Sequence, residues 1–275
     1  MPVREPRCSR DINRVRSSAG IRQRGLDTIA IVASHFDAIG FGVAQDRIND
    51  LLNDALMHGT KIPVSSDTSY SVWRPGGGPE LWVGIRESGA SKDLLALTPY
   101  FRGPSRLRVR IEGVEGGDSQ YPFEGRIAVW AIPRGQDDQE YPFSIDLADY
   151  ALLGDLAVGK ELNMPIAGFA HSLEWWPDEA SYKAATSDLQ LAPKSFIPVG
   201  MFKDSGAPPS SGLFTGIVKW SQRLVNRATA QEFLHVQVDT LSGEIDVVAD
   251  LGSVQGVPAL GGVVKATCWL CSVVS

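Results

Sequence analysis

Four stretches near the C-terminus decide the expected fold: LFTGIVKWSQRL (213–224), EFLHVQVDT (232–240), EIDVVA (244–249) and GVVKATCWLCSVV (262–274). Each is rich in β-branched and aromatic residues, which favour extended strands. Ser242-Gly243, between the second and third stretch, is typical of a tight hairpin turn. Residues 213–275 are therefore expected to form a small all-β domain, either an OB-like barrel or a β-meander. A domain this small buries only a marginal core, so we expect it to dock on the rest of the chain.

The chain upstream of these strands divides by composition. Ser205–Gly212 reads SGAPPSSG, which is the composition of a linker. Residues 1–26 contain seven Arg and few apolar residues, and we interpret them as a basic, disordered leader. The remaining residues, 27–204, are predicted to form an α+β domain. The expected fold class is thus α+β: mainly antiparallel β with a few helices, followed by the small C-terminal β domain.

Residues 44–58 are the clearest helix of the sequence, and Gly59 supplies its stop. The apolar residues at the spacing of one buried stripe are Ile48, Leu51, Leu52, Ala55 and Leu56. Residues 33–41 before the helix have strand character. Short strand candidates follow the helix at residues 61–64, 69–74, 80–86 and 94–100.

This order of elements resembles, over residues 33–100, the βαβββ module of the vicinal-oxygen-chelate fold. Proteins of that fold bind metal from such strands, so the resemblance implies His35 and Glu80 as candidate metal ligands. His171 and Glu174 form another loose pair of metal-ligand types, but residues three apart in a strand point to opposite sides. Further strand candidates lie at residues 106–111, 125–132, 144–147 and 166–175, and a helix is predicted from Pro177 to about residue 188.

The charge balance excludes several classes of partner. The chain has 275 residues, 43% apolar and 21% charged, with a formal net charge of −6. Because the seven Arg of residues 1–26 face only Glu5 and Asp11, the rest of the chain carries a net charge of −11. Binding to nucleic acids or to anionic membranes needs clustered Lys and Arg. The acidic net charge of residues 27–275, the acidic body of the chain, therefore argues against both kinds of partner. No apolar run approaches the roughly 18 to 20 residues of a spanning helix.

The three cysteines favour a reducing compartment, the cytoplasm, over a disulfide-stapled secreted domain. Cys268-Trp-Leu-Cys271 matches C-x-x-C. In a strand, however, two residues that are three positions apart face opposite sides of the sheet, so these two thiols cannot meet. No second Cys or His pair completes the four ligands of a structural zinc site. We therefore interpret Cys268 and Cys271 as packing residues and expect no cofactor.

Two features are candidate binding residues. Arg106, Arg108 and Arg110 fall on one face of a strand, about 6.7 Å apart. Their mutual repulsion requires nearby carboxylates or an anionic partner, and the acidic body favours internal pairing. Trp175 and Trp176 lie at a strand-to-helix junction, where adjacent indoles cannot face the same core. An exposed member of this pair is a candidate contact, because Trp is enriched at binding hot spots.

Recognisable catalytic motifs are missing from the sequence. There is no G-x-S-x-G elbow, and no Ser or Cys accompanies a His in a familiar arrangement. The Gly-rich stretch Arg74–Glu80 runs into a strand rather than a helix N-terminus, so we interpret it as a hairpin loop rather than a phosphate cradle.

The leading hypothesis is a non-enzymatic binding or assembly protein that engages a protein partner or a second copy of itself. One alternative is a metal-dependent enzyme with a βαβββ module that uses His35 and Glu80. Another is an OB-like oligonucleotide binder, which the net charge of −1 over residues 213–275 disfavours. Enzymatic activity is left open, and the missing motifs favour a binding role.

Overall fold

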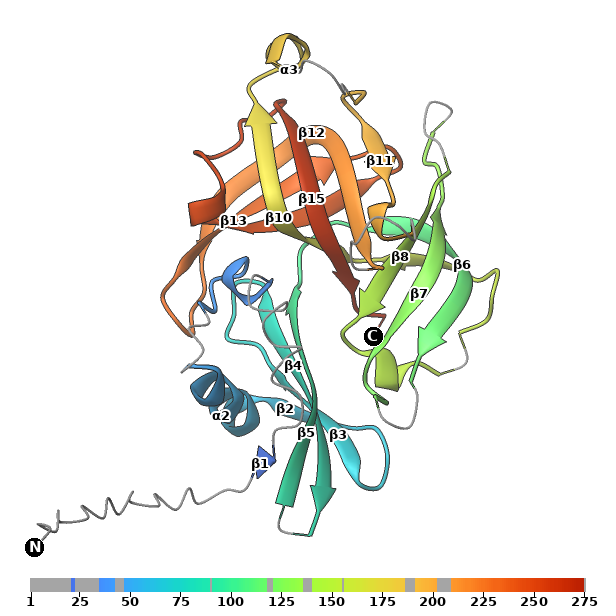
Figure 1. Ribbon diagram of the computed structural model, residues 1–275, viewed down its shortest axis with the longest axis vertical. Coiled ribbons are helices and arrows are strands. Elements are labelled where there is room, and N and C mark those ends of the chain that lie inside the picture. The colour runs from blue at the N-terminus through green and yellow to red at the C-terminus, as the bar shows by residue number, and fades with distance from the viewer. Residues whose placement is uncertain are drawn as a thin grey trace, which may run out of the picture.

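The computed structural model describes residues 21–22, 35–42, 47–89, 91–117, 121–135, 140–154, 156–185, 191–201 and 209–274. Within these ranges the fold is mostly β with few helices, among them α2 (Ile48–His58) and α3 (Glu179–Ala185). None of the helices in these ranges has the length and apolar character that crossing a membrane requires. Figure 1 shows a barrel at the top, a second sheet with α2 beside it below, and an extension of the barrel sheet at the right.

A five-stranded sheet forms the N-terminal part of the fold, in the order β1-β5-β4-β3-β2. Its strands are β1 (Ile21–Arg22), β2 (Thr60–Pro63), β3 (Thr68–Trp73), β4 (Pro79–Ser88) and β5 (Ser91–Phe101). β2 to β5 form consecutive antiparallel pairs and confirm the four strands predicted between residues 61 and 100. Of the predicted leader, the structure describes only Ile21 and Arg22, which pair in parallel with β5; the rest of residues 1–26 lies outside the described residues.

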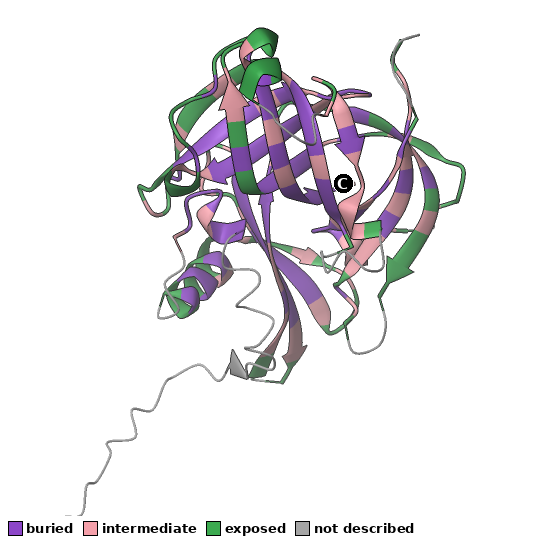
Figure 2. Ribbon diagram, turned by 45° about the horizontal axis from the view of Figure 1, so that its top comes forward, coloured by how far each residue is buried: buried purple, intermediate pink, exposed green. Residues whose placement is uncertain are grey.

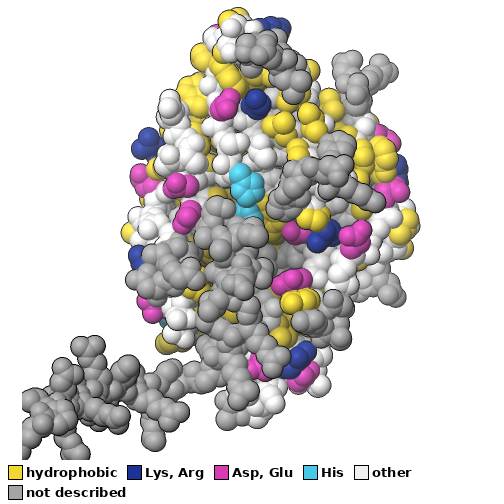
Figure 3. All heavy atoms as spheres, viewed as in Figure 1, with side chains coloured by type: hydrophobic (Ala, Val, Ile, Leu, Met, Phe, Trp, Pro, Cys, Tyr) yellow, Lys and Arg dark blue, Asp and Glu magenta, His cyan; other side chains and the backbone are white. Residues whose placement is uncertain are grey.

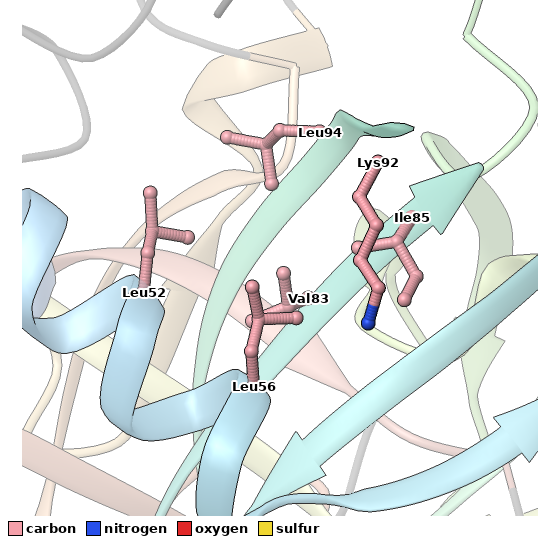
Figure 4. A pocket seen from close by; sticks show the side chains of 6 residues that line it. All are labelled: Leu52, Leu56, Val83, Ile85, Lys92 and Leu94. Atoms are coloured by element: carbon pink, nitrogen blue, oxygen red, sulfur yellow. The ribbon is translucent and has the colours of Figure 1, made fainter. Parts of the chain in front are cut away.

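Helix α2 covers one face of this sheet. Four of the five residues of the predicted stripe are buried, Ile48, Leu51, Leu52 and Ala55, and Leu56 is half-buried. Figure 4 shows two leucines of α2 projecting toward three apolar side chains of β4 and β5. These are Leu52 and Leu56 opposite Val83, Ile85 and Leu94. The cavity between them measures about 10 Å³, room for about one water molecule, so this contact is packed core rather than a ligand site.

The strand predicted at residues 33–41 is wrong where the structure describes it. Residues 35–37 form a helical turn, and Gly40 has a positive φ of 70°, which a regular strand does not contain. The turn is held from outside, because the Asn226 side chain donates to the Ile39 carbonyl (Nδ2···O 2.9 Å). The first strand of the βαβββ order is therefore missing from the described residues, whereas its helix and following strands are present.

The second sheet has ten strands in the order β11-β12-β13-β14-β10-β15-β8-β7-β6-β9. An additional pairing between β12 and β15 closes five of them into a barrel. The barrel strands are β10 (Ile166–Trp176), β12 (Ser211–Val225), β13 (Glu232–Asp239), β14 (Glu244–Asp250) and β15 (Val263–Ser272). Around the barrel all neighbours are antiparallel except β10 and β14. The predicted hairpin at Ser242-Gly243 joins β13 to β14, where the Thr240 amide donates to the Gly243 carbonyl (2.8 Å).

Further strands extend the barrel sheet on both sides. β8 (Pro142–Leu147) pairs in parallel with β15 and continues through β7 (Gly125–Ala131) and β6 (Leu107–Gly116) to β9 (Glu161–Met164). On the other side β11 (Ser195–Ile197) pairs with β12. Short 3₁₀ turns are η1 (Tyr150–Leu152), η2 (Val199–Met201) and η3 (Leu251–Ser253). These bounds confirm the strands predicted at residues 106–111, 125–132, 144–147 and 166–175.

Strands on both sides of the predicted linker belong to one sheet. Residues 205–208 lie outside the described residues, and Ser211 and Gly212 already form the buried start of β12. β12 pairs with β11, and β15 pairs with β8 and β10, so hydrogen bonds connect the C-terminal strands to segments upstream of the linker. The division into domains at 205–212 stays a prediction, and the barrel includes β10 from upstream of it.

The barrel strands bury apolar side chains on both faces. Residues inside the ten-stranded sheet, the inner core, include Leu234, Val236, Val238, Val247 and Leu270. Residues on the outer wall of the barrel pack with the five-stranded sheet and α2 in a second cluster, the outer core. Its members include Phe169, Phe233, Val248 and Trp269 of the barrel with Leu52, Leu81, Val83 and Phe101 of the N-terminal part. Figure 2 shows buried positions continuing from the barrel strands into the sheet below.

The two cysteines of β15 illustrate this alternation. Cys268 belongs to the inner core and Cys271 to the outer core, so the prediction that they face opposite sides of one strand is confirmed. Burial raises the pKa of both thiols well above the ordinary value. Both are therefore neutral packing groups near neutral pH.

A buried hydrogen-bonded cluster ties the barrel wall to the connection between β5 and β6. His235 Nε2 lies 2.7 Å from Asp246 Oδ1 on the neighbouring strand, and both side chains are almost fully buried. The Ser105 amide donates to the other carboxylate oxygen of Asp246 (2.8 Å), and the Phe101 ring lies edge-on against His235. Asp246 thus fixes where the chain leaves the five-stranded sheet and enters the barrel sheet.

Gly103 tests this junction. A Cβ on Gly103 would lie 2.1 Å from Asp246 Oδ2, so Gly103→Ala displaces the carboxylate from His235 and Ser105. We expect a loss of about 3 kcal/mol in the free energy of unfolding, because displacing the carboxylate leaves buried polar groups without their hydrogen bonds. Urea unfolding followed by circular dichroism measures it. Gly113→Ala is the matched control, because no atom lies within 4 Å of its Cβ; equal losses in the two variants contradict the role given to Asp246.

Candidate functional site

The two adjacent tryptophans end β10 at one mouth of the barrel. Trp175 and Trp176 pair with Val264 and Val263 of β15, and both indoles are half-buried. Trp175 packs against the inner core, whereas Trp176 lies edge-on against Tyr182 of α3, with ring centres 4.9 Å apart. The predicted divergence of the two indoles is therefore confirmed, and α3 confirms the helix predicted after Pro177 where the structure describes it.

The loop between η3 and β15 lies against this strand end. Trp175 Nε1 donates to the Gln255 carbonyl (2.7 Å), and the Ser221 hydroxyl of β12 donates to the Pro258 carbonyl. The Gly261 amide donates to the Val218 carbonyl (2.8 Å). Three hydrogen bonds, one from β10 and two from β12, thus hold the loop in place.

The loop presents apolar side chains to solvent. Leu260 is 77% exposed and Val257 is 36% exposed, although the backbone on either side of them is tied to the barrel. Together with the half-buried Trp175 and Trp176 they form the barrel-end patch. A fixed backbone that carries exposed apolar side chains is typical of a contact surface rather than of a mobile loop tip.

The three arginines of β6 and its entry are held by neighbouring groups. Arg108 pairs with Glu161 of β9 (3.0 Å), and Arg110 pairs with Glu112 (3.4 Å) and Glu140 (3.5 Å). Hydrogen bonds from Arg110 to Glu140 and Glu112 raise the pKa of the guanidinium. Arg106 donates instead to the carbonyls of Gly103 and Ser105. These contacts confirm the predicted internal pairing for Arg108 and Arg110. The positions of the three arginines can therefore be explained without an anionic partner.

The structure places His35 and Glu80 in different surroundings. Glu80 is 2% exposed and accepts from Arg74, Arg102 and Trp82 at 2.6 to 3.3 Å. Both carboxylate oxygens are occupied by these donors, which makes Glu80 a structural anchor for the loop before β4. His35 lies instead against the outer wall of the barrel, stacked on Trp269. Within the described ranges, no group of three or more His, Cys, Asp or Glu residues is arranged to hold a metal ion.

Sequence patterns missed two features of the surface. Val257 and Leu260 stand in an irregular loop, where no periodicity marks a buried or exposed position, although their place between Gly256 and Gly261-Gly262 could have suggested an exposed apolar loop. His35 and His171 lie 5.1 Å apart between ring centres, although each was assigned to a different candidate pair. Only the packing of the N-terminal segment on the barrel brings them together.

Trp175 and Trp176 are expected to differ in their contribution to stability. Trp175→Ala removes an inner-core contact and the bond to Gln255, and we expect a loss of about 3 kcal/mol in the free energy of unfolding. Trp175→Phe keeps one aromatic ring but loses the hydrogen bond and part of the indole packing, so we expect a loss of about 1 to 2 kcal/mol, smaller than for Trp175→Ala. Trp176→Ala opens a contact with Tyr182 at the surface and is expected to cost less than Trp175→Ala. Urea unfolding measures the free energy of unfolding of each variant. A larger loss for Trp176→Ala than for Trp175→Ala would mean that Trp176, not Trp175, is the inward indole.

Comparison of the chain with known protein families, with curated proteins and with solved structures finds no match in any of the three.

Proposed function

We propose that this chain is a non-enzymatic binding or assembly protein that docks a protein partner through the barrel-end patch. The observation that carries the proposal is Leu260, a large apolar side chain that is 77% exposed on a loop fixed by hydrogen bonds to two barrel strands. Burying such a side chain in a contact contributes about 1.5 to 3 kcal/mol.

The patch is suited to binding because its members are held in place before the contact forms. Trp175 is fixed by its bond to Gln255, and Trp176 by its packing on Tyr182. Rigid aromatic side chains lose little conformational entropy on binding, which is why they often anchor interfaces. Val257 and Leu260 supply apolar area beside them.

The partner class is protein rather than nucleic acid. Glu174, next to the patch, lies opposite Lys265 in the register of β10 and β15, so an acidic and a basic residue face each other there. Oligonucleotide binding needs a basic groove beside stacking aromatics, and residues 213–275 have a net charge of −1. A reducing compartment such as the cytoplasm belongs to the proposal, because Cys268 and Cys271 face opposite sides of β15 and cannot pair with each other.

The simplest partner is a second copy of the chain. Most homo-oligomers are two-fold symmetric, and a two-fold contact places the same patch on both sides of the interface. The exposed Leu260 and the half-buried indoles of Trp175 and Trp176 at this end of the barrel could meet their counterparts in such an arrangement. The patch therefore supports a symmetric dimer through the ends of two barrels.

Self-association is measured by sedimentation velocity from low micromolar to near-millimolar concentration. We expect a reversible dimer in the wild-type chain. Leu260→Lys places an unpaired charge in the contact and should weaken the dimer by at least about tenfold. Met57→Lys is the control: Met57 is 76% exposed on α2, away from the patch, and the substitution should leave the dimer unchanged.

Two results contradict the proposal. A wild-type chain that stays monomeric over the whole concentration range has no self-contact at the patch. A dimer that is equally strong in Leu260→Lys and in the wild type uses another surface. Thermal unfolding of both lysine variants establishes that any change in association is not a change in fold.

A further inference from the structure

His35 has a buried nitrogen that nothing satisfies. The side chain is 6% exposed, and its Nε2 atom has no hydrogen-bond partner within the part of the chain that the structure describes. A polar atom left in this state costs free energy, and buried polar atoms in proteins are nearly always paired. The unsatisfied nitrogen therefore calls for a partner that the described residues do not provide.

The ring next to it is the imidazole of His171, with ring centres 5.1 Å apart and planes inclined by 50°. His171 occupies a bulge in β10: Ala170 pairs with Cys268 and Ser172 with Thr267, which leaves His171 without a partner on β15. Bulges re-aim side chains and are frequent beside functional sites. The bulge thus places a second imidazole beside the unsatisfied one, on the face of the barrel that His35 covers.

The buried His35 ring is held by its surroundings, whereas His171 is an exposed residue beside it. His35 stacks on Trp269, with centroids 4.3 Å apart and planes inclined by only 12°. Trp269 Nε1 in turn donates to Asp146 Oδ2 (2.7 Å), and the other oxygen of Asp146 accepts from Ser210 (2.6 Å). Figure 3 shows histidine side chains, in cyan, near the middle of one face of the molecule. His35 therefore rests on a fixed aromatic support, with the His171 ring next to it.

We propose that His35 and His171 form a two-histidine site for a divalent late transition ion of the zinc class. Two imidazoles that share one tetrahedral ion, each with nitrogen about 2.0 to 2.1 Å from the metal, have ring centres about 5 Å apart, which is the separation here. Imidazole is a preferred ligand of Zn²⁺, Cu²⁺ and Ni²⁺. Such an ion would satisfy the buried nitrogen of His35.

The electrostatic surroundings fit neutral ligands. Burial, and then the neighbouring His171, lower the pKa of His35 to about 3, and burial also lowers the pKa of His171. Both imidazoles are therefore uncharged at neutral pH, the form that binds metal. Because no third metal-ligating side chain joins them within the described ranges, the remaining positions of the ion face water or a donor from a bound molecule.

Zinc titration of the full chain by isothermal calorimetry tests the site. The protein carries no affinity tag, is stripped with chelator, and has Cys8→Ser, because the Cys8 thiol lies outside the described residues and is itself a zinc ligand type. We expect one Zn²⁺ per chain and no heat with Mg²⁺, which prefers oxygen ligands. His171→Phe keeps a ring and removes both nitrogens, and should weaken zinc binding at least about tenfold.

His58→Phe is the matched control, because His58 is an exposed residue in the last turn of α2; zinc binding should be unchanged. Cu²⁺ gives a second readout, because an ion on His35 quenches the fluorescence of the stacked Trp269. The quenching amplitude should fall in Trp269→Phe. The site is overturned if the wild type binds no zinc, if His171→Phe binds as the wild type does, or if the quenching is indifferent to Trp269→Phe.

Discussion

Part of the outer wall of the barrel is apolar, and burying that part is the constraint on which the rest of the structure depends. A closed barrel of five strands fills its own interior with inward side chains. Here Phe169, Phe233, Val248 and Trp269 point the other way, and they would face water if the barrel stood alone. The five-stranded sheet and α2 cover them. One continuous outer core therefore ties the N-terminal part of the chain to strands that follow it by more than 100 residues.

Polar groups at this interface hold the segment that connects the five-stranded sheet to the barrel sheet. Asp246 points from the barrel wall toward the β5–β6 connection, where it receives His235 and the Ser105 amide. Gly103 lets the backbone approach because it has no side chain. At the barrel mouth, the wall is no longer covered, and the apolar side chains of the β14–β15 loop reach solvent. Among the residues that the structure describes, the barrel-end patch leaves Leu260 exposed, and the histidine pair leaves His35 Nε2 without a hydrogen bond.

Strand positions could be predicted from the sequence because they depend on local pattern. Alternation and turn residues located β6, β7 and β12 to β15, and the apolar stripe located α2. The opposite faces of Cys268 and Cys271 follow from strand geometry alone. The turn at 35–42 was missed, because its shape depends on Asn226 and on Gly40 at positive φ, contacts that no local pattern contains. An OB-like barrel was one of the two expected forms, but the membership of β10 was missed for the same reason, because β10 lies upstream of the predicted linker.

The candidate sites divide in the same way. The pairing of Arg108 and Arg110 with carboxylates, and the divergence of Trp175 and Trp176, follow from the period of a strand and the charge of the chain. The proximity of His35 to His171 does not, because it arises where two distant segments meet on the outer core. The loop at residues 254–261 has no periodic pattern of apolar residues. The exposure of Leu260 follows instead from the hydrogen bonds that hold this loop on β10 and β12.

The central claim is that the outer core makes the five-stranded sheet and the barrel one cooperative unit. Native-state hydrogen exchange, read by mass spectrometry on peptides from β4 and from β13, tests it most directly. The account predicts equal opening free energies for the two strands, lowered together by Phe233→Leu, since Phe233 packs on Phe101 across the interface. A barrel strand that keeps its protection while β4 exchanges freely, or a Phe233→Leu effect confined to β13, would contradict it.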